Sequence, residues 1–298
     1  MSGPGGHFAG RVTGALEVLV GGLLITVQDL GRPGLAHLGV PHSGALDRPA
    51  LALANRLVGN PPAAAGLEIT MSGCTVRPSH ATTLAVTGAP ARVTVNGREC
   101  GYAEPLAVRA GATVVIGAAI AGVRTYLAVA GGIDVVPVLG SRSTDTLSGL
   151  GPPPVRAGDV LPVGIAIGPP SPVDVVPPAV HPTPLRLRIR FGPRDDWFAP
   201  EARELLATPY TVSSDSNRIG ARLAGAALPR LEPGRQLPSE GIVVGAVQVT
   251  AGGLPLVFLA DHPTTGGYPV IAVVDAADVA RLAQARPGDS VVFHGPQR

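Results

Sequence analysis

The chain of 298 residues contains no lysine, and all 23 of its basic residues are arginine. A P-loop needs the lysine of GxxxxGK[ST] to reach the outer phosphates of a nucleotide, so a Walker-type phosphate site is excluded. Schiff-base chemistry and a biotin-carrying lysine are excluded as well, because both need an ε-amine. Any anion that this protein binds must therefore be held by arginine side chains, backbone N–H groups or a metal.

Aromatic residues and cysteines are also few, and the net charge is low. One Trp, four Tyr and five Phe give few rings for bases to stack on, and a formal net charge of +2 gives no basic stripe, so no nucleic acid is expected as a partner. Cys74 and Cys100, without CxxC spacing or a secretory n-region, predict a reduced, cytoplasmic protein. The apolar stretch 12–27 contains Glu17 and is shorter than the roughly 18 uncharged residues of a membrane span, so no membrane association is expected.

Glycine and proline are abundant, with 40 and 32 residues, and this excludes long helices. Short valine-rich runs between these turn residues predict strands, so the fold class is mainly β with a few short helices. Seven prolines between residues 165 and 184 predict a linker. The expected division is a flexible tail at 1–13, an N-terminal domain at 14–164, the linker at 165–184 and a C-terminal domain at 185–298. Each domain is expected to resemble a β-barrel.

Local patterns predict several elements. Asn96-Gly97 predicts a hairpin turn. From Leu185 to Phe191 apolar residues and arginines alternate, which predicts a strand with Leu185, Leu187, Ile189 and Phe191 on one face. Asp47 is a suitable N-cap for a helix that ends near Gly59. Two further helices are predicted at 200–206 and at about 275–285.

Four regions concentrate polar side chains beside glycine and proline: residues 25–47, 140–146, 210–223, and the linked pieces 238–249 and 259–269. Loops that hold polar groups in fixed positions are where binding residues gather. The candidate site residues in these regions are Gln28, Asp29, Arg32, His37, Ser43, Asp47, Arg142, Ser143, Asp145, Arg218, Ser239, Glu240, Asp261, Thr264, Thr265, Gly266, Gly267 and Tyr268.

Each region also has a purely structural interpretation. Asp29 and Asp47 are suited to capping turns or helices, with Arg32 paired to one of them, although the density of polar groups in region 25–47 favours function. Arg142 among three hydroxyls is suited to a carboxylate or phosphate, but Ser143 or Thr144 is equally suited to capping a turn around Asp145. The sequence Thr-Thr-Gly-Gly at 264–267 fits an anion-binding nest or a hairpin turn. No GxSxG or HExxH motif is present, so these patterns alone indicate loops that bind something small and anionic.

Several longer strings carry a family resemblance. They are TVQDLGRPG at 26–34, HLGVPHSGALD at 37–47, LANRLVGNP at 53–61, LEIT at 67–70, YLAVAGGIDV at 126–135, GSRSTD at 140–145, SEGIVVGAVQV at 239–249 and TTGGYP at 264–269. This set resembles the family of 5-oxoprolinase C subunits, also called allophanate hydrolase subunit 2 or the biotin-dependent carboxyltransferase family, which includes the regulator KipA. One departure concerns the site: His262-Pro263 precedes TTGGY where the family usually has Gln, so a hydrogen-bond donor is lost there.

The resemblance implies a cyclophilin-like fold in each half and three alternative roles. As the C subunit of 5-oxoprolinase, the chain would act with the A subunit, together with a KipI-like B subunit, to open the lactam of 5-oxoproline to glutamate, at the expense of ATP with Mg²⁺. As a carboxyltransferase component, it would serve a biotin-dependent urea carboxylase or allophanate system. As a KipA-like protein, it would bind a KipI-like inhibitor of a kinase. The absence of an attached biotin carboxylase or carrier segment, together with intact polar loops, favours the first role.

Under that interpretation the protein holds a small anionic substrate, and its nucleotide site lies either wholly in this chain or across the interface with the B subunit. Arg32, Arg142 and Arg218 are the expected anion clamps. Three carboxylates, those of Asp29, Asp145 and Asp261, are expected to orient the metal or a proton. His37 is the expected general acid or base, and the remaining candidates are expected to bind substrate or nucleotide.

Overall fold

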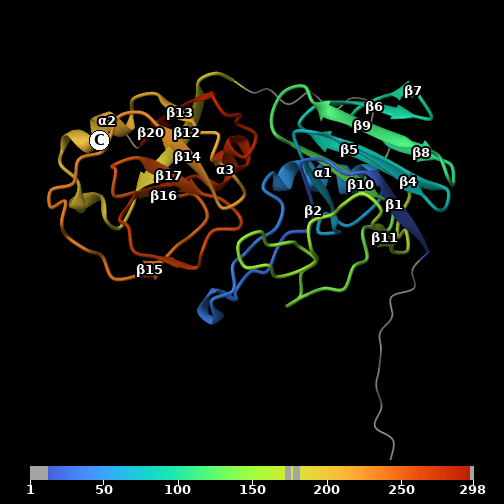
Figure 1. The fold of residues 1–298 in the computed structure, drawn as a ribbon, viewed down its shortest axis with the longest axis horizontal. Coiled ribbons are helices and arrows are strands. Elements are labelled where there is room, and N and C mark those ends of the chain that lie inside the picture. Colours follow the sequence, from blue (N-terminus) through green and yellow to red (C-terminus); the bar gives the residue numbers. More distant parts are fainter. Residues whose placement is uncertain (1–12, 172–175, 177–181, 296–298) are drawn as a thin grey trace, which may run out of the picture.

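The computed structural model describes residues 13–171, 176 and 182–295, and these form two β-rich halves that lie side by side (Figure 1). The mainly β fold class is confirmed, and three short α-helices occur in the described residues. Of the predicted tail only Thr13 is described, and part of the predicted linker also lies outside the described residues. The proposed domain limits therefore stay a prediction. In the part of the chain that the structure describes, no helix combines the length and the apolar character needed to cross a membrane.

The first half contains two sheets that share one aliphatic core. The six-stranded sheet has the order β11 (Val160–Val163), β1 (Gly14–Val20), β4 (Cys74–Pro78), β9 (Val114–Ala119), β6 (Ala91–Val95) and β7 (Arg98–Cys100). The five-stranded sheet has the order β2 (Leu24–Gln28), β3 (Gly66–Thr70), β10 (Arg124–Val129), β5 (Thr82–Gly88) and β8 (Leu106–Val108). Leu16 and Val114 of one sheet join Ile25 and Leu67 of the other in the same buried cluster, so the two sheets face each other.

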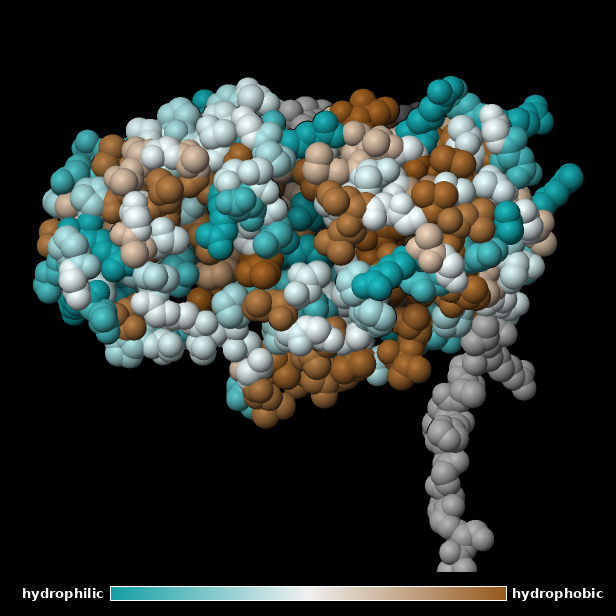
Figure 2. Space-filling view, in the orientation of Figure 1, coloured by the Kyte–Doolittle hydropathy of each residue, from teal (hydrophilic) through white to brown (hydrophobic). Residues whose placement is uncertain are grey.

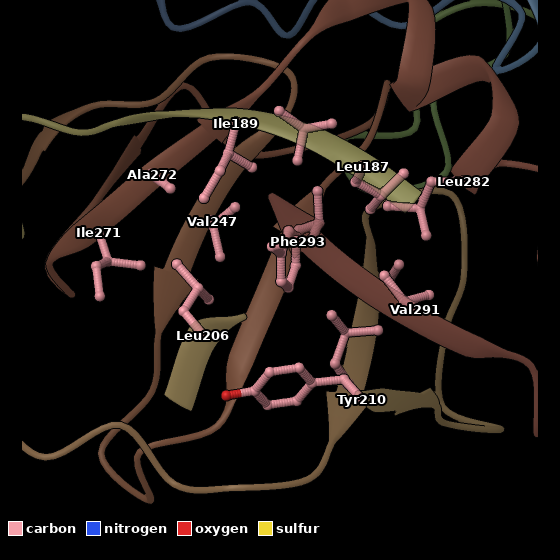
Figure 3. Close-up of a cluster of buried hydrophobic side chains, with 14 of the residues drawn as sticks. Leu187, Ile189, Leu206, Tyr210, Val247, Ile271, Ala272, Leu282, Val291 and Phe293 are labelled. Carbon is pink, nitrogen blue, oxygen red and sulfur yellow. The ribbon is translucent and has the colours of Figure 1, made fainter. Parts of the chain in front are cut away.

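The second half is a closed barrel with a parallel pair between its first and last strands. The order around the barrel is β12 (Leu185–Phe191), β19 (Val270–Val274), β16 (Ala246–Val249), β17 (Pro255–Phe258), β14 (Gly220–Ala224), β13 (Tyr210–Val212) and β20 (Ser290–His294). Figure 3 shows its interior, where Leu187, Val247, Ile271 and Phe293 point toward one another. Closure leaves no unpaired strand edge in this barrel.

The alternation predicted for β12 is confirmed in its first part. Leu185, Leu187 and Ile189 are buried inside the barrel, and the arginines between them are exposed. Phe191 departs from the pattern, because it lies at the strand end and remains 37% exposed. The guanidinium of Arg203 covers its ring at 4.6 Å from the centroid, which explains why an aromatic residue is tolerated there.

The predicted turn and helices are also present. Asn96 and Gly97 have φ of 50° and 79° and join β6 to β7, as a tight hairpin turn requires. Helix α1 (Arg48–Leu57) starts after Asp47, whose Oδ1 accepts a hydrogen bond from the backbone N of Ala50 at 3.0 Å. The other helices are α2 (Glu201–Leu206), α3 (Ala276–Leu282) and the single turns η1 (Ala36–Leu38) and η2 (Asp195–Trp197). Helix α3 ends three residues earlier than predicted.

Polar side chains at the end of α3 connect the two halves. Gln284 is 3% exposed, and its Oε1 accepts hydrogen bonds from the backbone N atoms of Val123 at 2.9 Å and Arg124 at 2.8 Å. Its Nε2 donates to Oδ2 of Asp47 at 2.8 Å. Figure 1 shows α1 and α3 on the facing sides of the two halves, with loops of the first half reaching toward the second. These hydrogen bonds join the second half directly to the first half.

Candidate functional site

Arg218 and Asp261 form the centre of a buried charge network between the halves. The Arg218 side chain is 1% exposed and donates to the Asp261 carboxylate twice, Nε to Oδ2 and Nη2 to Oδ1, both at 2.9 Å. It also donates to Glu68 and, at 2.8 Å, to the carbonyl oxygen of Gly44. Burial lowers the pKa of Arg218, but the two carboxylates outweigh burial and hold the pKa above its ordinary value. Arg218 therefore braces the halves and is not a free anion clamp.

Glu68 supplies the first half of this network. Its Oε2 accepts hydrogen bonds from Tyr126 Oη at 2.7 Å and from the backbone N of Leu46 at 3.0 Å, and the Nε of Arg124 lies 3.5 Å from its Oε1. Burial raises the pKa of Glu68, but Arg218 and Arg124 outweigh that effect and keep the pKa below its ordinary value. Glu68 was not among the predicted site residues, although a carboxylate inside a buried strand is a signal that a partner charge is present.

Asp29 organises the loop at 140–146. Its Oδ1 accepts hydrogen bonds from Ser143 Oγ at 2.5 Å, Ser141 Oγ at 2.6 Å and the backbone N of Gly31 at 2.8 Å. Its Oδ2 accepts from the backbone N of Arg142 at 2.6 Å. Regions 25–47 and 140–146 are therefore in direct contact, and four protein donors occupy the Asp29 carboxylate.

Arg32 joins three loop segments. Its side chain donates to the carbonyl oxygens of Val138 at 3.0 Å and Ser143 at 2.5 Å, and to Ser43 Oγ at 3.1 Å. Ser43 Oγ donates in turn to Oδ2 of Asp145 at 2.6 Å. Arg32 is 2% exposed, and burial is the main reason why its pKa lies below the ordinary value. Arg32 thus has a structural role, but its bonds go to these loop acceptors and not to Asp29 or Asp47, the pairing considered from the sequence.

The three aspartates do not fit the metal site expected from the sequence. Beyond the four bonds of Asp29, Asp145 accepts hydrogen bonds from Ser43 and from the backbone N atoms at 147 and 148, and Asp261 accepts from Arg218 and Thr146. Mg²⁺ prefers carboxylates that remain available as ligands. Within the described ranges, no group of three or more His, Cys, Asp or Glu residues is placed to hold a metal ion.

Three other predicted site residues differ from one another in their environments. Arg142 is not a free clamp, because its Nη2 donates to Asp134 Oδ1 at 2.5 Å and its Nε to the backbone. His37 lies exposed on η1. Gln28 is fully buried, and its Nε2 donates to the carbonyl oxygen of Thr144 at 2.9 Å. This hydrogen bond stabilises the position of the loop at 140–146.

The TTGG segment forms neither of the two structures considered from the sequence. Thr265 and Gly266 make the short strand β18 (Thr265–Gly266), which pairs antiparallel with β15 (Glu240–Gly241). A nest needs a residue with positive φ, and neither Gly266 nor Gly267 has one. A local hairpin is also absent from this segment, because the partner strand lies more than twenty residues upstream.

The linked piece around Glu240 is occupied by local contacts. Glu240 is paired with both Nε and Nη2 of Arg194, and these bonds lower the pKa of its carboxyl. Ser239 is exposed. The Tyr268 ring is 44% exposed, with the guanidinium of Arg230 at 5.8 Å from its centroid. These side chains therefore stabilise the β15–β18 pair and its surface.

A cavity of about 210 Å³ lies between loops of the two halves. Its polar lining residues are Arg32, His42, His262 and Thr264. His42, Val243 and Val244 also line a second cavity of about 520 Å³, whose polar rim includes Arg48 of α1. The two cavities thus meet at His42, and together they are the candidate site.

Two histidines at this junction have a pKa below the ordinary value. Burial is the main cause for both His42 and His262, which favours the neutral imidazole. His42 lies in one of the predicted polar regions but was not among the predicted site residues. His262 was noted in the sequence only because it departs from the family pattern. Arg48 was missed as well. The available signal for all three was their position within or next to the family strings.

The chain belongs to the family of carboxyltransferase domains with subdomains A and B, whose family model matches residues 38–295. The two-half architecture and the site between the halves fit that bipartite description. The family predicted from the sequence strings is therefore confirmed.

Among particular proteins, the chain is 40% identical to the C subunit of 5-oxoprolinase from Escherichia coli, over 93% of this chain and 90% of that protein. Two solved structures are similar in fold. The structure of TTHA0988 has a TM-score of 0.86 at 39% identity, and the match covers 95% of this chain and 56% of that one. The urea amidolyase of Kluyveromyces lactis has a TM-score of 0.88 at 30% identity, over 95% of this chain and 19% of that one.

Proposed function

We propose that this chain is the C subunit of an ATP-dependent 5-oxoprolinase, a lactam hydrolase that is active only with partner subunits. The observation that carries the proposal is the match to the E. coli protein over nearly the full length of both chains. The urea amidolyase, by contrast, is matched over 19% of its length. The complete assembly opens the ring amide of 5-oxoproline to give glutamate, and we place it in the cytoplasm, where ATP is available.

An amide is a poor electrophile, and ATP supplies the activation that makes the ring carbonyl reactive. The arginines predicted to clamp a nucleotide are engaged with protein acceptors, and the aspartates Asp29, Asp145 and Asp261 do not fit a Mg²⁺ site. We therefore assign ATP with Mg²⁺ to another subunit of the assembly or to the interface with it. This chain contributes the lactam-binding cavity with its histidines and Arg48.

An exposed apolar surface supports the partner role. Figure 2 shows hydrophobic side chains gathered along the lower edge of the molecule, near the loops that follow β2 and β10. Exposed apolar residues of these loops are Leu38 at 64%, Val136 at 82%, Leu139 at 51% and Leu147 at 46%. Contiguous apolar surface on a soluble protein marks an interaction site. We propose that the B subunit docks here, beside the cavity, and that Val136→Asp weakens its co-purification without changing the melting temperature.

Reconstitution tests the proposed function. Purified A and B subunits are combined with this chain, and ATP-dependent release of glutamate from 5-oxoproline is measured. Turnover is expected only when all three proteins are present. Full turnover by the isolated chain would contradict the need for partners, and a verified complex without turnover would refute the lactamase assignment.

Carboxyl transfer is the second candidate, favoured by the TM-score of 0.88 to the K. lactis urea amidolyase over 95% of this chain. In that case biotin would be carried by another protein, because this chain has no lysine to bear it. The test supplies the chain with a biotinylated carrier, a biotin carboxylase, bicarbonate, ATP and urea. Carboxylation of urea, with no glutamate release from 5-oxoproline, would select this candidate. Partner binding with neither activity would select a KipA-like regulatory role.

A further inference from the structure

The imidazole of His262 is oriented by its own backbone. Its Nδ1 lies 2.7 Å from the carbonyl oxygen of Pro263, so Nδ1 carries the proton and donates. The Nε2 atom is then the unprotonated, basic nitrogen. No hydrogen bond among the described residues uses Nε2 of His262, and the side chain lines the smaller cavity. His262 therefore presents a base to whatever enters that cavity.

His42 has the same arrangement. Its Nδ1 lies 3.1 Å from the carbonyl oxygen of Ser43. The Nη2 atom of Arg48 lies 2.9 Å from Nδ1 and 3.3 Å from Nε2 of the same ring. A donor in the ring plane bonded to Nδ1 would be much farther from Nε2, so Arg48 stacks on the face of the imidazole. The bond from Nδ1 to Ser43 can therefore form, and Nε2 keeps its lone pair in the ring plane.

The lining of the larger cavity indicates which kind of substrate the two histidines would meet. Its wall is mainly apolar and includes Leu46, Val244, Val274 and Val279, and Arg48 adds one cation at its rim. A cavity of this kind fits a small ring or alkyl body that carries one carboxylate. With the carboxylate at Arg48, a small ring in this cavity lies beside His42, which lines both cavities.

We propose that Arg48 binds the substrate carboxylate and that His42 and His262 are the proton-transfer pair of the reaction, an inference that rests on the proposed lactamase function. Water attacks the activated ring carbonyl carbon and gives a proton to Nε2 of one neutral imidazole as the C–O bond forms. The same imidazole returns that proton to the ring nitrogen when the C–N bond breaks, so the imidazole ends the cycle neutral. The carbonyl oxygen that ATP has phosphorylated remains in an acyl phosphate, which a second water hydrolyses to the side-chain carboxylate of glutamate and inorganic phosphate. The second imidazole holds the attacking water through its own Nε2.

The charges facing the pair define the expected pH dependence. Around His42 these are Arg48 and His262, which lower its pKa, and Asp29, which raises it. Asp145 and Asp261 face His262 and raise its pKa, but burial is the larger effect. Because the neutral form is the base, kcat is expected to fall as pH drops through the lowered histidine pKa, below about 6.5.

Asparagine variants isolate the role of Nε2. His262→Asn and His42→Asn keep a donor near the position of Nδ1 and delete Nε2, so the bond to the backbone carbonyl is retained. In the reconstituted assembly, each is expected to lower kcat about 100-fold, to leave KM for 5-oxoproline within about 3-fold, and to flatten the acid limb of the pH profile. His294→Asn, at the exposed end of β20, is the matched control and is expected to match wild type.

Arg48 is tested by the opposite kinetic signature. Arg48→Gln is expected to raise KM for 5-oxoproline at least about 10-fold while kcat changes little, because a carboxylate contact is lost in both ground and transition states. Arg56→Gln on the same helix is the control, since Arg56 is exposed at its other end.

Assembly and melting temperature of each variant are compared with wild type first, and His262→Gln and His42→Gln replace any asparagine variant that fails this check. If the wild-type assembly is active and the histidine variants keep its kcat and the acid limb of its pH profile, the proton-transfer role of the two histidines is wrong, while the proposed function stands. An unchanged KM in Arg48→Gln would overturn the carboxylate assignment. An inactive wild-type assembly would overturn the proposed function and the pair with it.

Discussion

Arg218→Ala tests whether the buried network holds the two halves together. The substitution removes the partner of two carboxylates, those of Asp261 and Glu68, both at most 1% exposed. Asp261 keeps its bonds from Thr146, and Glu68 keeps Arg124 at 3.5 Å, so neither carboxylate is left without any partner. Breaking a buried ion pair from one side costs about 3–5 kcal/mol, and we expect about 4 kcal/mol for this pair.

This loss corresponds to a fall in melting temperature of about 10 °C or more, which scanning calorimetry and urea unfolding can both measure. The effect has a definite pH dependence. Because the folded-state pKa of Glu68 is lowered, its contribution is present above the unfolded pKa and is lost as pH falls through the folded value. The Arg218→Ala variant lacks this contribution of Glu68 to stability. The difference in free energy of unfolding between the variant and wild type should therefore become smaller below about pH 4.

Arg222→Ala is the matched control, since Arg222 lies exposed on β14, close in sequence to Arg218. It is expected to change stability by less than about 0.5 kcal/mol. If Arg218→Ala cost less than about 1 kcal/mol, or if the difference from wild type did not change with pH, the network would not be what holds the halves together.

Arg32→Ala should lower the free energy of unfolding by about 2–3 kcal/mol in urea, because two buried acceptors and one partly buried acceptor lose a charged donor. Normal stability with weakened ligand binding would favour the clamp role instead. Gly266→Val should disrupt the β15–β18 pair and speed its hydrogen exchange, since an added Cβ would lie 2.4 Å from Ile242 Cδ1; wild-type exchange rates would contradict this. Burial raises the pKa of Cys74 to about 12, so native alkylation at about pH 8 should modify the partly exposed Cys100 first, and peptide mass spectrometry showing Cys74 modified first would refute the assignment.

Much of the fold could be predicted from the sequence, because local patterns specify local structure. The Asn96-Gly97 turn, the cap at Asp47 and the alternation along β12 each depend on a few neighbouring residues. The pairing of β15 with β18 could not be predicted in this way, since it depends on how the chain returns after more than twenty residues. A barrel-like second half was predicted, but its strand order could not be, because that order depends on long-range pairings.

The loops that line the smaller cavity lie within polar regions selected from the sequence, but the contacts of the individual residues could not be predicted. Residues such as Arg32, Asp29 and Arg218 are polar and lie in the predicted regions, but their hydrogen bonds go to the protein. Residue type cannot reveal whether an arginine meets a ligand or a backbone carbonyl. His42 and His262 stand out only when burial and the shared cavity are known.

The charge network has a consequence for recombination between relatives. The acid and base that neutralise each other come from opposite halves, Glu68 from the first and Arg218 from the second. A chimaera that joins one half of this chain to the other half of a distant relative would place a buried charge opposite an unmatched side chain. The two halves must therefore diverge together at these positions, and a successful exchange has to carry both residues.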